Sequence, residues 1–161
     1  QFRAVDIAYG DSLYSMTILL PHKEASVQEL IDSLNTETWT QVTEGLAPQS
    51  LSRLQMPKFT LRYEKTLNDV LTDLGMGVAF TKRANFRDIA DTSLAIDKVK
   101  HKTFLQVDEE GTEASAATSV GIRVTSTPPT FIVDRPFVVA IREHHSGTIL
   151  FLGTVMDPTA G

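Results

Sequence analysis

The sequence predicts a mixed α+β fold in which strands outnumber a few short helices. Three observations lead to this prediction. Short apolar or alternating runs bounded by proline, glycine or polar turns recur along the chain, as is typical of strands. Helical periodicity is confined to short segments, and no internal repeat or low-complexity tract appears. Strands interspersed with short helices indicate the α+β class.

The chain begins with two expected strands, at residues 3–8 and 13–20. The second is almost continuously apolar, which is typical of a strand that is buried on both faces. Pro21 is expected to end it, because proline interrupts a strand ladder.

Two short helices are expected next. Ser26, with Glu29 three residues further on, forms a capping-box signal for the first helix. A second helix is expected from Thr36 or Thr38 to about Glu44. The apolar positions of the first helix are Val27, Leu30, Ile31 and Leu34.

The middle of the chain should hold two strands and one helix. Residues 51–63 alternate loosely and contain Pro57, so we expect two strands with a bend at the proline. Thr66 is expected to cap a helix that Gly75 stops. The apolar residues of this helix fall at i, i+3, i+4 and i+7, as Leu67, Val70, Leu71 and Leu74.

The rest of the chain is predicted to be irregular and then rich in strands. Residues 76–96 show no regular period, and the expected packing anchors are Phe80, Phe86 and Ile89. Further strands are expected at residues 99–107, 131–133, 137–141 and 149–155, the last two joined by a polar turn.

Composition excludes several functional classes. The 161 residues are 42% hydrophobic and carry a net charge of −5, so the basic field that nucleic-acid binding requires is missing. There is no cysteine, which excludes disulfides and thiolate metal sites but leaves the redox compartment open. No apolar run approaches the roughly 20 residues that a membrane span needs.

The segment between the strands at 99–107 and 131–133 is the part of the sequence that says most about function. From Thr112 to Val124 it alternates as a half-buried strand does, but its first inward residues are small. It ends in Ser126-Thr127-Pro128-Pro129, which a central strand would not tolerate. The segment can therefore be exposed in one state and a buried strand in another. A flexible polar linker would have a similar composition.

Motifs along the whole chain carry a family resemblance. In order they are Tyr9-Gly10-Asp11, Tyr14-Ser15-Met16, Leu19-Leu20-Pro21, Met56-Pro57-Lys58-Phe59, Leu74-Gly75-Met76-Gly77, His101-Lys102, residues 108–117, Asp134-Arg135-Pro136-Phe137 and Asp157-Pro158. The chain resembles the C-terminal part of a serpin, a serine protease inhibitor that inserts its reactive loop into its own central sheet. The resemblance implies a serpin-like α+β fold with mixed sheets. It also implies that residues 1–161 are the C-terminal portion of one larger domain, whose N-terminal part is expected as a separate or nicked chain.

The resemblance assigns a reactive-centre loop at about residues 110–130. The residue before the cut bond lies fourteen places after Gly111, which makes Thr125-Ser126 the reactive bond. The small Thr125 suits an elastase-like or subtilisin-like protease, whereas Arg123 is the alternative for a trypsin-like one. The implied hinge residues are Glu109, Gly111, Thr112, Ala114, Ala116, Ala117 and Thr118.

Two further positions follow from the resemblance. His101 matches a buried histidine in the region where the central sheet opens. Lys58 and Glu109 match a pair at the top of that sheet; two unrelated surface charges are the alternative.

His22, His144 and His145 lack ligand spacing, so neither a metal nor another cofactor is expected.

The function implied is inhibition of serine proteases by suicide cleavage, with no enzymatic activity of its own. No nucleophile pattern accompanies the histidines. A non-inhibitory serpin that acts as a carrier or folding assistant is one alternative, and a plain protease substrate with a linker loop is another. The resemblance also implies an extracellular or cell-surface location.

Overall fold

A computed structural model describes residues 2–48, 50–108 and 129–158. The chain divides into two compact units. One consists of residues 1–60 with 106–161, and the other of residues 61–105. In the described part of the chain, no helix is both long and apolar enough to cross a membrane.

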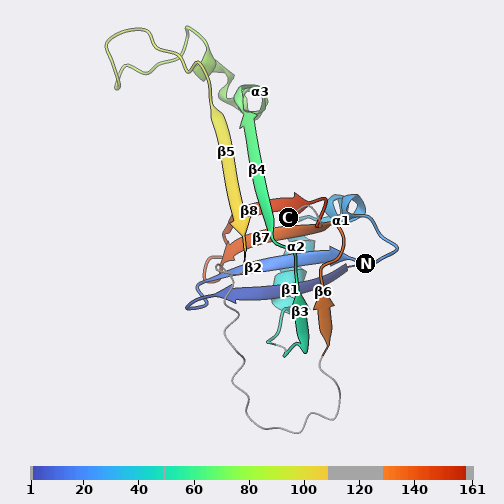
Figure 1. Cartoon of the computed structure of the whole chain (residues 1–161). Coiled ribbons are helices and arrows are strands. Elements are labelled where there is room, and N and C mark those ends of the chain that lie inside the picture. The colour runs from blue at the N-terminus through green and yellow to red at the C-terminus, as the bar shows by residue number, and fades with distance from the viewer. Residues whose placement is uncertain (1, 49, 109–128, 159–161) are drawn as a thin grey trace. The chain divides into compact units, whose positions relative to one another are not determined.

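The first unit is built on a four-stranded antiparallel sheet in the order β1-β2-β7-β8 (Figure 1). Its strands are β1 (Phe2–Tyr9), β2 (Tyr14–Pro21), β7 (Phe137–Glu143) and β8 (Ile149–Val155). Every residue of β2 after Tyr14 is buried. The apolar run that predicted a strand buried on both faces thus forms an inner strand of this sheet, and Pro21 is its last residue, as expected.

Two helices pack on one face of this sheet. α1 (Val27–Ser33) has the predicted capping box, in which Ser26 and Glu29 satisfy each other's backbone N–H groups. α2 (Thr36–Gly45) begins at the earlier of the two predicted residues, because the Asn35 side chain accepts a hydrogen bond from the Thr38 N–H. The apolar cluster beneath the helices comprises Leu19, Val27, Leu30 and Val138, with Phe2, Ala4, Leu34, Trp39 and Val42 around them.

The opposite face of the sheet carries buried phenylalanine side chains. Neighbouring residues of a strand point to opposite faces, so Phe137 faces away from the helices that Val138 contacts. The Phe137 side chain is fully buried, and its ring meets that of Phe59 edge-on at a centroid distance of 5.6 Å. Phe131 is 2% exposed. The buried aromatic residues therefore come from both sides of residues 109–128 in the sequence.

Residues 51–63 form two strands with a bend at the proline, as predicted. β3 (Arg53–Gln55) precedes Pro57, and β4 (Phe59–Thr66) follows it. β3 pairs in parallel with β6 (Thr130–Ile132), and β4 pairs with β5 (Lys100–Val107).

The predicted helix after β4 is shorter and less regular than expected. α3 (Asn68–Leu71) is followed by a π-helical turn (Thr72–Met76) and a 3₁₀ turn (Gly77–Phe80). Thr66 is not the cap, because it is still the last residue of β4. Instead the Asn68 side chain bridges two backbone groups, donating to the Asp97 carbonyl at 2.8 Å and accepting from the Val99 N–H at 2.9 Å.

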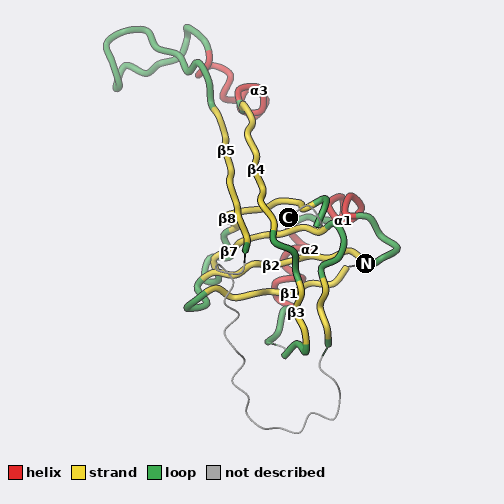
Figure 2. Tube along the Cα trace, viewed as in Figure 1, coloured by secondary structure: helices red, strands yellow, loops and turns green. Residues whose placement is uncertain are grey.

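Gly75 interrupts the π-helical turn rather than ending it: it has a φ of 94° and lies one residue before the turn ends at Met76. The packing expected around this region is only partly present. Ile89 is 76% exposed, so it is not the packing anchor that was predicted, and Leu74 of the predicted helix is 75% exposed. Phe80 and Phe86 are half-buried. Residues 81–99 contain neither helix nor strand, in agreement with the predicted irregular stretch (Figure 2).

Candidate functional site

The predicted hinge and reactive bond lie in residues 109–128, outside the described part of the chain. The predictions that fall there concern Glu109, Gly111, Thr112, Ala114, Ala116, Ala117, Thr118, Arg123, Thr125 and Ser126. The structure describes the residues on either side, Asp108 and Pro129. The candidate site is therefore built from these two anchors.

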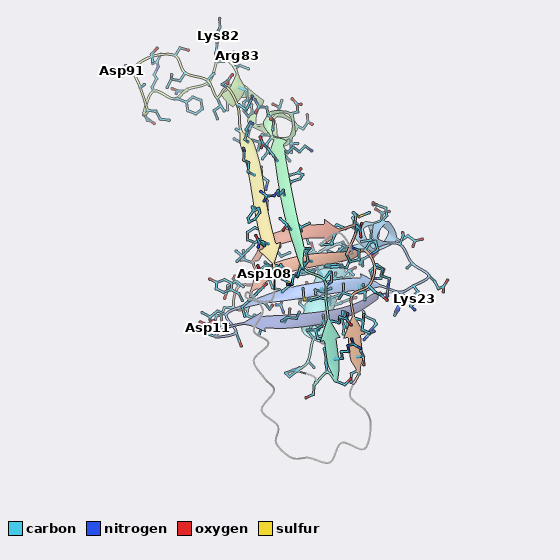
Figure 3. All side chains as sticks on the ribbon, viewed as in Figure 1. Asp11, Lys23, Lys82, Arg83, Asp91 and Asp108 are labelled. Atoms are coloured by element: carbon cyan, nitrogen blue, oxygen red, sulfur yellow. The ribbon has the colours of Figure 1, made fainter. Side chains whose placement is uncertain are left out.

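The upstream anchor is the end of β5. Val107, the last residue of the strand, is 7% exposed and belongs to the core of the first unit. Asp108 follows it, as the label in Figure 3 shows, and its carboxylate accepts a hydrogen bond from the Gln106 side chain at 3.1 Å. The segment thus leaves directly from a strand whose end is buried.

The downstream anchor is the start of β6. The Pro129 carbonyl accepts hydrogen bonds from the Ser52 backbone N–H at 3.0 Å and the Ser52 hydroxyl at 3.3 Å. The Ser52 hydroxyl also lies 3.1 Å from the Thr130 hydroxyl. β6 then runs parallel to β3 with Phe131 opposite Leu54, and the Val133 N–H donates to Gln55.

Arg3 of β1 adds a second attachment to this anchor. Its Nη2 donates to the Thr130 carbonyl at 2.7 Å, and its guanidinium carbon lies 4.7 Å from the centre of the Phe131 ring. The backbone hydrogen bond fixes the position of Thr130, while the stacked guanidinium covers Phe131. Arg3 thereby links the four-stranded sheet to the β3–β6 pair.

The β4–β5 pair carries a cluster of charge. The Glu64 carboxylate lies 2.5 Å from Lys100 Nζ and 2.9 Å from Lys102 Nζ. Hydrogen bonds from Lys100 and then Lys102 lower the pKa of Glu64 below its ordinary value. Because all three side chains are about half exposed or more, this cluster contributes little to stability.

His101 differs from the expectation that it is buried. The side chain is exposed, its Nε2 lies 2.9 Å from the Thr103 hydroxyl, and its ring meets that of Tyr63 at 6.1 Å. The physical reason is that β5 pairs with β4 alone among the described strands. A part for His101 in opening the central sheet stays a prediction, as does the Lys58–Glu109 pair, because Glu109 is outside the described residues.

A buried polar network that the sequence reasoning missed crosses β1, β2 and β7. The Asp6 carboxylate accepts hydrogen bonds from the hydroxyls of Ser15 at 2.9 Å and Thr17 at 2.5 Å. It also accepts one from Arg142 Nη2 at 3.1 Å, and His144 Nε2 lies 3.6 Å away. The sequence offered one signal for this network: the charged residues Asp6 and Arg142 lie within the largely apolar strands β1 and β7.

The turn between β7 and β8 is stabilised by Glu143. Its carboxylate accepts from the N–H groups of His145 at 2.9 Å and Ser146 at 2.6 Å, and from the Ser146 hydroxyl at 2.6 Å. These donors, the Ser146 hydroxyl first, lower the pKa of Glu143 to about 2. His144 and His145 lie at this turn, and no group of potential metal ligands occurs within the described residues.

Comparisons with known proteins identify this architecture. A family model described as serpin (serine protease inhibitor) matches residues 1–158. Serpin-Z2A of Triticum aestivum is 35% identical over an alignment of 156 residues, and the match covers 90% of this chain and 39% of that protein. The structure of a thermophilic serpin, tengpin, in the native state has a TM-score of 0.72 and 33% identity, and the match covers 97% of this chain and 42% of that chain. The structure of thyroxine-binding globulin in complex with thyroxine has a TM-score of 0.78 and 26% identity, and the match covers 98% of this chain and 41% of that chain.

The fold and the matched model define a class of proteins described as serine protease inhibitors. The chain belongs to the serpin family. It spans about two fifths of the length of the relative and of the two solved structures. The predicted resemblance and the serpin-like α+β fold are therefore confirmed.

Proposed function

We propose that the complete protein inhibits serine proteases through suicide cleavage of the segment between β5 and β6. The observation that supports this most directly is the pair of separate anchors, with Val107 at the end of β5 and Pro129 before β6. A cut at Thr125-Ser126 leaves the upstream piece joined to β5 and the downstream piece joined to β6. The alternating residues 112–125 are then free to become a new strand.

The length of this strand is sufficient to displace a bound protease. Thr112 to Thr125 is fourteen residues, and at about 3.3 Å per residue a strand of that length spans about 45 Å. A protease held by an acyl bond to Thr125 would be carried over that distance. Distortion of its oxyanion hole would then stall hydrolysis of the acyl bond.

The residue before the cut bond sets the class of target. Thr125 is short and β-branched, so we propose an elastase-like or subtilisin-like protease with a shallow primary pocket. Arg123 is the alternative, for a trypsin-like enzyme. Mass spectrometry of the released C-terminal peptide distinguishes them, because it begins at Ser126 in the first case and at Val124 in the second.

We also propose that a further portion of the serpin completes this fold, as a separate or nicked chain. Leu152 and Met156 are 61% and 65% exposed, and both lie in or next to β8 at the edge of the four-stranded sheet. Intact-mass analysis of the protein from its natural source would find that portion. Finding whether the protein in that source lies outside or inside the cells would test the extracellular or cell-surface location that we propose.

A carrier is the second candidate function. It is favoured by the likeness to the structure of thyroxine-binding globulin in complex with thyroxine. A carrier has no need of small inward residues at 112–118, whereas an inhibitor that inserts this segment does.

One gel experiment separates the candidates. The complete protein is mixed with an elastase-like and a trypsin-like protease, and an SDS-stable adduct is expected with the elastase-like one. Ala114→Glu should still be cleaved but should form little adduct, because a large charge slows entry of the segment into the sheet. Ser115→Glu, on the opposite parity, is the matched control and should retain the adduct. Cleavage without adduct in the unmodified protein would refute inhibition, and undiminished adduct with Ala114→Glu would refute insertion.

A further inference from the structure

Residues 81–99 form the longest stretch without helix or strand in the described part of the chain. They lie in the second unit, between the 3₁₀ turn that ends at Phe80 and the start of β5. The stretch contains an adjacent basic pair, Lys82-Arg83, whose side chains are both exposed. Figure 3 shows Lys82 pointing away from the ribbon. Exposed loops of this kind are preferred sites of proteolytic cleavage.

The hydrogen bonds around this basic pair are local. The Ala84 N–H donates to the Thr81 carbonyl at 3.0 Å, and the Arg83 N–H donates to the Thr81 hydroxyl at 3.2 Å. Among the described residues, the hydrogen bonds of residues 82–90 join positions no more than four apart. Opening of this turn therefore breaks no hydrogen bond to a distant part of the chain, and such local opening costs little free energy.

Other exposed basic residues are less suited to cleavage by a trypsin-like protease. Lys23 and Lys58 lie in short connections between regular elements, which leave little chain free to enter a protease. Arg87 lies in the same long stretch, but Asp88 follows it. The carboxylate of Asp88 would be repelled by the acidic primary pocket of such an enzyme. The bond after Arg83 has no carboxylate beside it and is therefore the preferred one.

Contacts across the basic pair hold the second unit together. The Asn68 side chain bonds the backbone at Asp97 and at Val99. The Ile96 N–H donates to the Ala79 carbonyl at 2.9 Å, and β4 pairs with β5. Each of these contacts joins a residue before the basic pair to a residue after it. The two pieces should therefore stay associated after a cut between them.

We propose that Lys82-Arg83 is a cleavage site for trypsin-like serine proteases, separate from the predicted reactive bond, and that the product is a two-chain protein that stays folded. Water adds across the bond between Arg83 and Ala84: the Arg83 carbonyl carbon takes the hydroxyl, and the Ala84 nitrogen takes the proton. The pieces on either side remain tied to β4 and β5. No long segment is released to form a new strand, so the protease leaves as it does from an ordinary substrate.

The first experiment is limited digestion of the complete protein with trypsin, followed by mass spectrometry of the fragments. Within this chain and outside residues 109–128, the first new N-terminus should be Ala84. The double variant Lys82→Gln/Arg83→Gln should slow this cut about a hundredfold or more, because the primary pocket requires a basic residue. Lys23→Gln is the matched control and should be cut at the unmodified rate. A first cut after another basic residue, or undiminished cleavage of the double variant, would overturn the proposal.

The state of the cut protein tests the second half of the proposal. Both pieces should elute together in gel filtration, and the melting midpoint should stay within about 4 °C of that of the uncut protein, the shift that roughly 1 kcal/mol causes. Separation of the pieces, or a larger fall of the midpoint, would overturn the proposal.

A last measurement rests on the proposed function. The protein cut after Arg83 is mixed with an elastase-like protease, and the SDS-stable adduct should then carry residues 84–125 in place of the whole upstream chain. Adduct from the uncut protein but none from the cut protein would show that the cut disturbs the fold, and would overturn the proposal. Adduct from neither would refute the proposed inhibition and leave the cleavage site, established by the fragment masses, in place.

Discussion

The ion pair of Asp6 with Arg142 offers a sharp test of how the four-stranded sheet is stabilised. The side chains are 16% and 10% exposed, and the pair joins β1 to β7 across β2. Asp6→Asn keeps the shape of the side chain and removes its charge. The Arg142 guanidinium then retains a hydrogen bond to the Thr17 hydroxyl at 3.2 Å but no neighbouring carboxylate within the network.

The expected cost follows from this burial. Removing one partner of a buried ion pair costs about 3–5 kcal/mol, and the residual exposure of Asp6 reduces the expected loss to about 2–4 kcal/mol. Arg142→Met should cost less, because Asp6 keeps the hydroxyl donors of Ser15 and Thr17. The double variant should be more stable than the sum of the two losses predicts, with a coupling of about 1–2 kcal/mol.

The assay is urea unfolding of the complete protein, with the midpoint and slope measured for each variant. Glu64→Gln is the matched control, because Glu64 pairs with Lys100 and Lys102 on the exposed β4–β5 surface, where solvent screens the pair, so its urea midpoint should stay close to that of the unmodified protein. If the free energy of unfolding of Asp6→Asn lies within about 0.5 kcal/mol of that of the unmodified protein, and the urea slope is unchanged, the pair does not stabilise the sheet and the reasoning is wrong.

Three further outcomes are expected. Ser26→Ala should lower the free energy of unfolding by about 1 kcal/mol through loss of the α1 cap, while Ser26→Asp should retain most of it; equal urea midpoints for both would contradict the capping assignment. The folded-state pKa of Glu143 is about 2, below its ordinary 4.5, so the stability that this carboxylate contributes is complete above about pH 4.5 and is lost as the pH falls toward 2. Glu143→Gln should therefore flatten the decline of unfolding free energy on the acid side of a pH series. An unaltered decline would show that other carboxylates govern it. Cleavage between Val120 and Ser126 should raise the calorimetric melting midpoint by tens of degrees, each 1 kcal/mol being worth roughly 2–4 °C, and a flat or lower midpoint would favour a carrier or a simple substrate.

Local signals predicted most of the fold. The capping box at Ser26, the bend at Pro57 and the apolar run of residues 13–20 each appear in the structure close to where the sequence placed them. These signals succeed because each depends on a few neighbouring residues. The prediction that Thr66 caps the next helix was wrong because this region depends on distant residues. The backbone partners of the Asn68 side chain lie about 30 positions along the chain, at Asp97 and Val99.

The candidate site was less accessible to such reasoning. The small alternating residues indicated a segment that changes state, but the contacts at its ends involve partners distant in sequence. Arg3 reaches Thr130 across 127 positions, and Ser52 reaches Pro129 across 77. An exposed arginine near the start of a strand gives no sign of what it touches. The family resemblance supplied the predicted reactive bond at Thr125-Ser126, which stays a prediction, and only the three-dimensional arrangement revealed the contacts of Pro129 and Thr130.

The place of β2 in the sheet bears on how the protein is made. β2 lies between β1 and β7, and Thr17 meets Arg142, which is 125 positions further along the chain. At about 5–20 residues per second, the ribosome needs roughly 6–25 seconds to synthesise that stretch. During this time the β1–β2 hairpin exists with one edge and much of its apolar surface uncovered. We therefore expect the nascent chain to depend on chaperones in the interval before β7 emerges.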